Sequence, residues 1–493
     1  MTDQAFRLSD AQMAQFIAHG YVTITPDLPD EFHAEVFAKH EEVFEKEGNP
    51  GNNLLPRIPL VRQVFDHPSV VGALQSVCGD DYYLQPHRHP HHNKAHSKGQ
   101  NMHQDGGKRW SHRTRYLLAF YYPQDTPLER GPSGIVPGSH YFNTPEGARI
   151  DGEVPLVTPA GTVTITNYDL WHRAMPNTSD QHRYMVKFLF ARMSEPVLPA
   201  WNNRRAGWPG IDPALPGDGA ELQKMYAHVW HWNLGDGSGA LPTPEGSPAE
   251  LLDTLAGEDE RAGIAAAYDL AALGQDMVPG LIEKLGEESE MTRRNAAYAL
   301  SAIGAPAVGA LIDALGQTNT STRTDAATTL GDIALAADAA LPALVASCQD
   351  KHEDVRRAAA EALGTVGQYE PNVVPTLIDA VTDDHVGVRT AAVFALCRLG
   401  PQAAEAVEAL EGVLDDENRY VRGDALHALQ RIDTSQAKDA LIKHLVPARW
   451  CPITSPDDVC RVDGCPPTAK GSGLLDDADG TDELCLDLCE FAP

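Results

Sequence analysis

Residues 293–304 read Arg-Arg-Asn-Ala-Ala-Tyr-Ala-Leu-Ser-Ala-Ile-Gly, and similar stretches return further along the chain. Residues 356–367 read Arg-Arg-Ala-Ala-Ala-Glu-Ala-Leu-Gly-Thr-Val-Gly, and residues 389–400 read Arg-Thr-Ala-Ala-Val-Phe-Ala-Leu-Cys-Arg-Leu-Gly. Two more copies open at Arg323 and Arg422, so the leading arginines are 30, 33, 33 and 33 residues apart. A fixed period of this length is typical of a solenoid, in which each repeat stacks on its neighbours.

A second helical segment precedes these helices, as at residues 342–347, 374–381 and 406–414. Units of two helices with small alanines at their contacts resemble HEAT repeats, and they predict an all-α solenoid. We expect the repeated arginine to bind an acidic group of the neighbouring unit, because a guanidinium pairs well with a carboxylate. Asp354 and Asp383 are the acids that lie nearby in the predicted loops.

A stretch rich in glycine and proline separates the repeats from the preceding part of the chain. Residues 235–248 contain seven such residues: Gly235, Gly237, Gly239, Pro242, Pro244, Gly246 and Pro248. Neither a helix nor a strand tolerates that density. We therefore divide the 493 residues into an N-terminal domain at 1–240, a linker at 241–248, the solenoid at 249–445 and an acidic, cysteine-rich tail at 446–493.

The N-terminal domain shows short alternating runs at 116–122, 161–166 and 184–190, separated by glycine and proline turns. This pattern predicts an antiparallel β-sandwich or barrel. A helix is expected to begin at the N-cap Ser9 and to end at Gly20, before a first strand.

Three residues of this domain could bind a metal. His103 and Asp105 lie in Met-His-Gln-Asp-Gly, and in an extended segment residues i and i+2 point to the same side. His172 follows 67 residues after Asp105. Two imidazoles and one carboxylate on one face of a non-haem Fe(II) leave three positions open. A second His-x-Asp pair, His352 and Asp354, falls at a helix start, where the two side chains diverge.

Arg183 lies eleven residues beyond His172, at the head of a predicted strand. A planar guanidinium there can hold a carboxylate through two parallel hydrogen bonds.

Residues 8 to about 200 resemble the phytanoyl-CoA dioxygenase family. The resemblance rests on the opening Leu-Ser-Asp-Ala-Gln and Phe-Ile-Ala-His-Gly-Tyr-Val, on His-Gln-Asp, on Tyr-Tyr-Pro-Gln-Asp and Gly-Pro-Ser-Gly-Ile-Val-Pro-Gly-Ser-His, and on the spacing of His172 and Arg183. It implies a double-stranded β-helix of the jelly-roll or cupin-like type, with flanking helices. It also implies Fe(II) on His103, Asp105 and His172, with Arg183 anchoring 2-oxoglutarate.

The resemblance further implies that O2 is a cosubstrate and that succinate and CO2 are released while an unactivated C–H bond is hydroxylated. Related halogenases place a small residue where this chain has Asp105, so the aspartate favours hydroxylation.

Two other groups of residues near the triad have alternative interpretations. His87, His89 and His91 alternate, so they share one strand face and either line a substrate pocket, bind a second metal or only flank the barrel mouth. The second group is a basic island in an acidic chain, made of Lys94, Lys98, Lys108, Arg109, Arg113 and Arg115. It indicates an anionic substrate, or it only balances the negative charge of the chain, and we favour charge balance.

The tail contains four cysteines whose spacing allows a tetrahedral zinc site: Cys460, Cys465, Cys485 and Cys489. Disulfides, or an acidic tail without fixed structure, are the alternatives.

The composition excludes some partners. The formal net charge of −30, from 69 acidic and 39 basic residues, argues against nucleic acid and anionic membranes. No apolar run of membrane-spanning length is expected, and no secretory signal opens the chain, so we expect a cytoplasmic protein.

Three hypotheses about function follow. The first is a hydroxylase of a small organic molecule, with the solenoid only assembling or stabilising it. The second is a protein- or carrier-directed hydroxylase that recruits its partner on the concave face of the solenoid. The third is a catalytically silent adaptor.

Overall fold

The computed structural model describes residues 4–211, 219–235 and 243–446. The four cysteines of the predicted zinc site, Cys460, Cys465, Cys485 and Cys489, lie outside the described residues.

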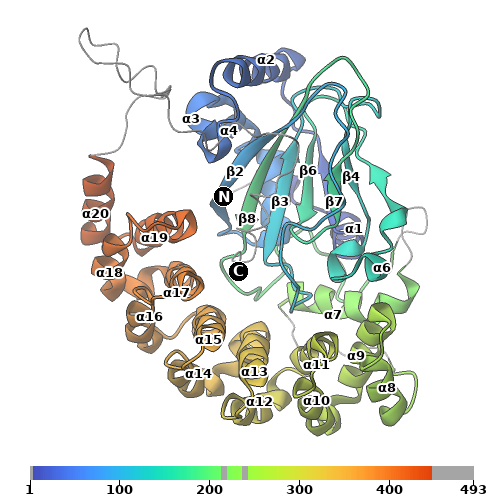
Figure 1. The fold of residues 1–493 in the computed structure, drawn as a ribbon, viewed down its shortest axis with the longest axis vertical. Helices are drawn as coiled ribbons and strands as arrows, with labels where there is room; N and C mark the ends of the chain where they lie inside the picture. Colours follow the sequence, from blue (N-terminus) through green and yellow to red (C-terminus); the bar gives the residue numbers. More distant parts are fainter. Residues whose placement is uncertain (1–3, 212–218, 236–242, 447–493) are drawn as a thin grey trace.

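The N-terminal domain is built on two antiparallel sheets that face each other (Figure 1). The larger sheet has the order β1-β6-β3-β8-β2, with β1 Tyr21–Ile24, β6 Val163–Asn167, β3 Tyr116–Tyr121, β8 Arg183–Ala191 and β2 Tyr83–Asn93. The smaller sheet has the order β5-β4-β7, with β5 Val154–Pro155, β4 Ser133–Ile135 and β7 His172–Ala174. This is the expected jelly-roll type of fold.

Alternating side chains of the larger sheet fill the space between the sheets. Leu118 and Phe120 of β3 and Met185 and Leu189 of β8 pack there with Ile135 of the smaller sheet. The intervening residues of β3 and β8 pack on the opposite face of the sheet, as the period of two requires.

Helices cover that outer face. They are α1 Asp10–His19, α2 Asp30–Glu47, α3 Leu54–Arg57, α4 Leu60–Phe65 and α5 Pro68–Cys78, while the short α6 Pro145–Ala148 lies in a later loop. Phe65 of α4 stacks on Phe188 of β8 with ring centroids 4.3 Å apart. Ser9 forms a capping box at the start of α1, and Gly20 ends the helix with φ of 78°, so the predicted first helix is confirmed.

The solenoid forms an arc around one side of the β-domain (Figure 1). Its inner helices face that domain and are α9 Glu260–Leu273, α11 Glu290–Ile303, α13 Thr320–Ile333, α15 Glu353–Val366, α17 Val386–Leu399 and α19 Arg419–Ile432. Its outer helices are α10 Val278–Leu285, α12 Val308–Leu315, α14 Leu341–Ser347, α16 Val374–Ala380 and α18 Val407–Gly412. The arc is flanked by α7 Gln223–Asn233, α8 Pro248–Leu255 and α20 Ser435–Leu445.

One helical stretch, Thr320–Ser347, is long and apolar enough to span a membrane by length and composition, which the sequence analysis did not expect. It consists of α13 and α14, which belong to successive repeats, with a kink at Ala337 between them. Half of its most apolar window is buried inside the protein, so packing within the solenoid accounts for its composition.

A row of ion pairs joins successive repeats. Arg323 pairs with Asp350 at 2.8 Å, Arg356 with Asp383 at 2.7 Å and Arg389 with Asp416 at 2.9 Å. The expectation for Asp383 is therefore confirmed, whereas the expectation for Asp354 is wrong. Asp350 takes that role because it lies in the loop in step with Asp383 and Asp416, while Asp354 lies in the first turn of α15.

Replacing Arg356 with methionine should lower the free energy of unfolding by about 1–3 kcal/mol, because it leaves the largely buried Asp383 without its charged hydrogen-bond donor. Arg357→Met is the matched control, since Arg357 and Glu361 are 3.6 Å apart and 36% and 43% exposed. The control should change stability by less than about 0.5 kcal/mol. Urea unfolding of the full chain measures both, and equal midpoints for the two variants would contradict the assigned role.

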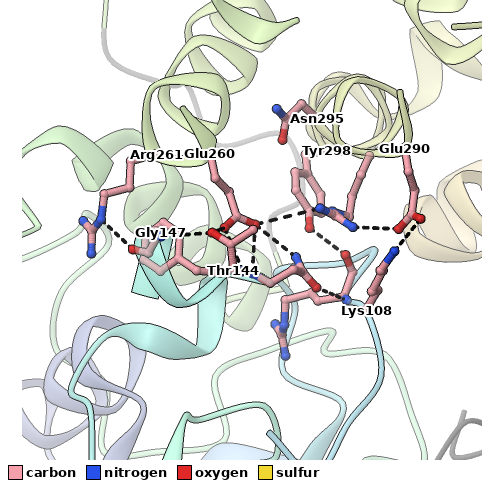
Figure 2. A network of polar contacts seen from close by, with 12 residues as sticks. Lys108, Thr144, Gly147, Glu260, Arg261, Glu290, Asn295 and Tyr298 are labelled. Carbon is pink, nitrogen blue, oxygen red and sulfur yellow. Dashed lines mark hydrogen bonds and ion pairs between the residues drawn. The ribbon is translucent and has the colours of Figure 1, made fainter. Parts of the chain in front are cut away.

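The concave face of the solenoid contacts the β-domain at its N-terminal end (Figure 2). The carboxylate of Glu260 accepts hydrogen bonds from the backbone N–H groups of Asn143 and Thr144 at 2.8 and 3.0 Å. Lys108 pairs with Glu290 at 2.6 Å, and the Tyr298 hydroxyl donates to the backbone carbonyl of Arg109 at 2.7 Å. The face that one hypothesis assigned to a protein partner therefore holds the chain's own β-domain.

The other end of the arc contacts strand β2. The Tyr83 hydroxyl donates to the Gly423 carbonyl at 3.1 Å, and the Tyr83 ring stacks on His427 with centroids 3.8 Å apart. His87 lies 3.4 Å from the hydroxyl of Tyr420. Both ends of the solenoid are thus attached to the β-domain.

Candidate metal centre and cosubstrate pocket

The structure brings His103, Asp105 and His172 together. His103 and His172 lie directly opposite each other in an antiparallel bridge, with N–O distances of 3.0 and 2.9 Å, and their ring centroids are 4.6 Å apart. The Nε2 atoms of His103 and His172 lie 3.9 and 3.4 Å from the Asp105 carboxylate. One ligand atom from each residue falls within 4.8 Å of the others, which is close enough to share a metal ion.

The local backbone differs from the expected extended segment. His103 forms a bridge of a single residue, and Asp105 lies in a bend that leads into Gly106 and Gly107. The bend turns the carboxylate toward both imidazoles, so the three side chains converge without a regular strand.

Backbone carbonyls fix the orientation of both imidazoles. Nδ1 of His103 lies 2.8 Å from the carbonyl of Asn101, and Nδ1 of His172 lies 2.8 Å from the carbonyl of Leu170. A carbonyl can only accept, so Nδ1 carries the proton and donates in each case. The lone pair of Nε2 then faces the carboxylate, which is the arrangement that metal-binding histidines commonly use.

The protonation states suit a metal site. Burial lowers the pKa of His172 to about 4, against the opposing effect of Asp105, so the imidazole is neutral near pH 7. Burial would raise the pKa of Asp105, but the nearby Lys187, His172 and His103 outweigh it and hold the pKa well below its ordinary value. The pocket therefore offers one carboxylate and, at His172, a neutral imidazole, as binding to a divalent cation requires.

Lys187 is a neighbour that the sequence analysis missed. Its ammonium lies 2.7 Å from Oδ2 of Asp105, and the residue is buried in the middle of β8. The available signal was a single charged residue within the apolar run Tyr184–Phe190. A buried lysine needs an acidic partner, and Asp105 supplies it.

Arg183 lies on the same face of β8 as Lys187, four residues away, and is 1% exposed. Its Nε donates to the carbonyl of Gly131 at 2.9 Å. Among the described residues, its Nη2 has no hydrogen-bond partner. Burial lowers the pKa of Arg183 to about 10, so the guanidinium stays charged at pH 7. A buried cation with an unused donor fits the carboxylate of a bound ligand.

Comparison with known families gives two matches. Residues 9–185 match Phytanoyl-CoA dioxygenase (PhyH), and residues 248–331, 308–397 and 374–449 match HEAT repeats. The chain joins a phytanoyl-CoA dioxygenase domain to HEAT repeats. The N-terminal domain is therefore an oxygenase domain of this family.

Several solved structures are similar to this domain. The carbocyclase SnoK from nogalamycin biosynthesis is 23% identical, with 39% of this chain and 88% of that chain covered and a TM-score of 0.33. EctD from S. alaskensis with bound Fe is 16% identical, with coverages of 41% and 86% and a TM-score of 0.33. No curated protein matched the chain.

The row of histidines lies inside the oxygenase domain. The rings of His87 and His89 are 4.5 Å apart, and those of His89 and His91 are 4.7 Å apart. Among the described residues, one cluster of histidine, cysteine or acidic side chains is close enough to share a metal ion. It consists of His103, Asp105 and His172. The row extends from the contact with Tyr420 toward the triad, so it forms a wall of the barrel interior.

Much of the basic island is balanced by acids of the oxygenase domain and the HEAT repeats. Lys108 pairs with Glu290, Arg109 with Asp169 and Arg115 with Glu195. The favoured interpretation, charge balance, fits these three residues. Arg113 is 7% exposed and forms no direct ion pair within the described ranges, but its charge acts on the nearby Asp332 and Glu195.

Proposed function

We propose that the protein is an Fe(II)- and 2-oxoglutarate-dependent dioxygenase that hydroxylates a small organic molecule. The main support for this proposal is that His103, Asp105 and His172 each place one ligand atom within 4.8 Å of the others. Hydrogen bonds from Nδ1 hold both imidazoles in this orientation. The intact triad and the buried Arg183 argue against a silent adaptor.

Each residue has a defined task in this proposal. His103, Asp105 and His172 would bind Fe(II) on one side, and Lys187 would hold the second oxygen of Asp105 in place. Arg183 would bind the distal carboxylate of 2-oxoglutarate, and apolar side chains such as Phe120 would exclude water. The bound iron would supply the activation of O2.

The overall reaction balances. One oxygen atom of O2 enters the carboxylate of succinate as 2-oxoglutarate loses CO2, and the other converts a substrate C–H bond into C–OH. The two electrons from the decarboxylation and the two from the C–H bond reduce O2 fully.

The structure supports this candidate over recruitment of a protein partner. Recruitment requires a concave face open to a partner, whereas Lys108, Arg109 and the loop at Asn143–Gly147 lie against α9 and α11.

The test measures succinate by mass spectrometry after the full chain has been stripped of metal and incubated with 2-oxoglutarate in air. Succinate should form only after Fe(II) is restored, with one iron bound per chain. Adding Zn²⁺ instead should give binding without succinate, because zinc has no redox chemistry. A chain that binds iron stoichiometrically and forms no succinate with any tested small-molecule mixture would refute the proposal.

A further inference from the structure

A cavity of about 630 Å³ lies between the oxygenase domain and the HEAT repeats. On one side it is lined by the loop that begins at Gly106, the residue after Asp105, and by Tyr116 at the start of β3. On the other side it is lined by residues of α11, α13, α15 and α17, among them Phe394 and Arg398. Its volume suits a small organic molecule.

The cavity lies at the opposite end of the barrel from Arg183. Lys187, which contacts Asp105, is paired with Phe120 in the middle of the sheet, and the Phe120 ring is 5.7 Å from that of His172. Arg183 lies four residues before Lys187 in β8, and Tyr116 lies four residues before Phe120 in β3. Because the two strands are antiparallel, Arg183 and Tyr116 lie on opposite sides of the Lys187–Phe120 pair, each about 13 Å away along its strand. A cosubstrate on Arg183 and a molecule in the cavity would therefore approach the metal ligands from opposite sides.

The repeats form part of the cavity wall. Tyr116 faces the barrel interior with Leu118 and Phe120, and its ring stacks on that of Phe394 from α17 at 6.3 Å. The loop after Asp105 is attached to α11 through Lys108 and Arg109 (Figure 2). The opening of the barrel is thus completed by the solenoid.

Arginines and acids gather at the base of the cavity. The arginines are Arg113, Arg115, Arg192 and Arg398, and the acids around them include Glu195, Asp332 and Glu361. Arg115 pairs with Glu195 and Asp332, and Arg192 donates to carbonyl and amide oxygens.

Two arginines that line the cavity each have a buried donor atom without an acceptor among the described residues. Arg113 and Arg398 are each 7% exposed, and within the described part of the chain neither forms an ion pair. The Nε atom of each is buried without a hydrogen-bond partner among the described residues. Burial lowers the pKa of Arg398 and Arg115 lowers it further, while the carboxylates of Glu195 and Glu361 act in the opposite direction. A buried guanidinium N–H without an acceptor is costly, and an anionic group of a ligand in the cavity would supply that acceptor.

We propose that this cavity is the substrate site, that its substrate carries a carboxylate or phosphate group, and that Arg113 of the oxygenase domain and Arg398 of the HEAT repeats bind that group. The inference rests on the proposed function for the identity of the site, and it makes the solenoid a part of the substrate pocket.

The test measures binding to the full chain by calorimetry, with 2-oxoglutarate present at saturation so that Arg183 is occupied. The probes are phenyl phosphate and benzoate, with neutral benzamide as their comparison. At least one anion should bind clearly more tightly than benzamide, and which one does so identifies the anionic group. Arg398→Met and Arg113→Met should each weaken that anion about tenfold or more, as expected for a charged hydrogen bond.

Arg389→Met is the matched control, because Arg389 lies on the same helix as Arg398 but pairs with Asp416 outside the cavity. It should bind the anion as the natural chain does. If Arg398→Met unfolds, Arg398→Lys retains the charge, and it should retain more affinity than Arg113→Met. Equal binding by the Arg398 and Arg389 variants, or no binding of either anion, would overturn the inference.

The two proposals fail in different ways. Succinate formation without anion binding would remove the substrate assignment and leave the oxygenase intact. Anion binding that depends on Arg398, without succinate from iron-loaded protein, would remove the oxygenase assignment and leave an anion site. Anion binding lost in Arg183→Met but kept in Arg398→Met would place the probe in the cosubstrate pocket and overturn the inference.

Discussion

Asp105→Asn should lower Fe(II)-dependent succinate formation by at least about 1,000-fold, because loss of a partner that only supports a ligand already costs about 10–100-fold. The asparagine keeps the shape of the side chain but removes the negative charge that faces both Nε2 atoms. It also leaves Lys187, 2.7 Å away, as a buried cation beside the metal position. Repulsion between that ammonium and Fe(II) should add to the lost ligand.

The measurements are the iron content and the rate of succinate formation of the full-length Asp105→Asn variant. Asp180→Asn is the control, because Asp180 is 97% exposed and contacts an exposed histidine. The control should bind one iron and turn over normally. Stoichiometric iron and a normal rate in the Asp105 variant would show that the triad is not the metal site.

Arg183→Met should raise the KM for 2-oxoglutarate by about 100-fold or more, because loss of one partner of a buried charge pair costs about 2–5 kcal/mol. The buried guanidinium has one contact to Gly131 and an unused Nη2 donor, and methionine fills similar space without either group. Iron binding should not change, because Arg183 lies four residues along β8 from the level of Lys187.

Initial rates against 2-oxoglutarate concentration, with iron content measured in parallel, check this prediction. Arg173→Met is the matched control, since Arg173 follows His172 in the chain but pairs with Glu153 at 2.6 Å. Its KM should stay near that of the natural chain. An unchanged KM in the Arg183 variant would assign the cosubstrate carboxylate to another cation, with Lys187 as the nearest choice.

Local spacing in the sequence predicted the elements that carry the site. Arg183 lies at the head of β8, where the alternating pattern predicted a strand. His103 and Asp105 come together as expected, but through a bend at Asp105 and not through the predicted extended segment. Ser9 and Gly20 predicted the bounds of α1 because capping depends on nearby residues. The Arg356–Asp383 pair followed from the repeat period.

Contacts that depend on how the two domains meet could not be predicted. Glu260 is typical of an acid in the first turn of a helix, yet its carboxylate binds the N–H groups of a loop about 116 residues earlier. Arg113 and Arg115 look equivalent in sequence, but among the residues that the structure describes only Arg115 of the two forms ion pairs. No local pattern encodes which inner helix lies opposite which loop, so the cavity was not foreseen.

Because the solenoid is attached to the β-domain at both ends, the number of its repeats cannot change freely. Glu260 fixes α9 to one edge of the β-domain, and Gly423 and His427 fix α19 to strand β2. An inserted or deleted repeat between them would move the second anchor by the width of one unit, so one of the two junctions would have to open. The number of repeats is therefore matched to the breadth of the barrel, unlike in solenoids with a free end.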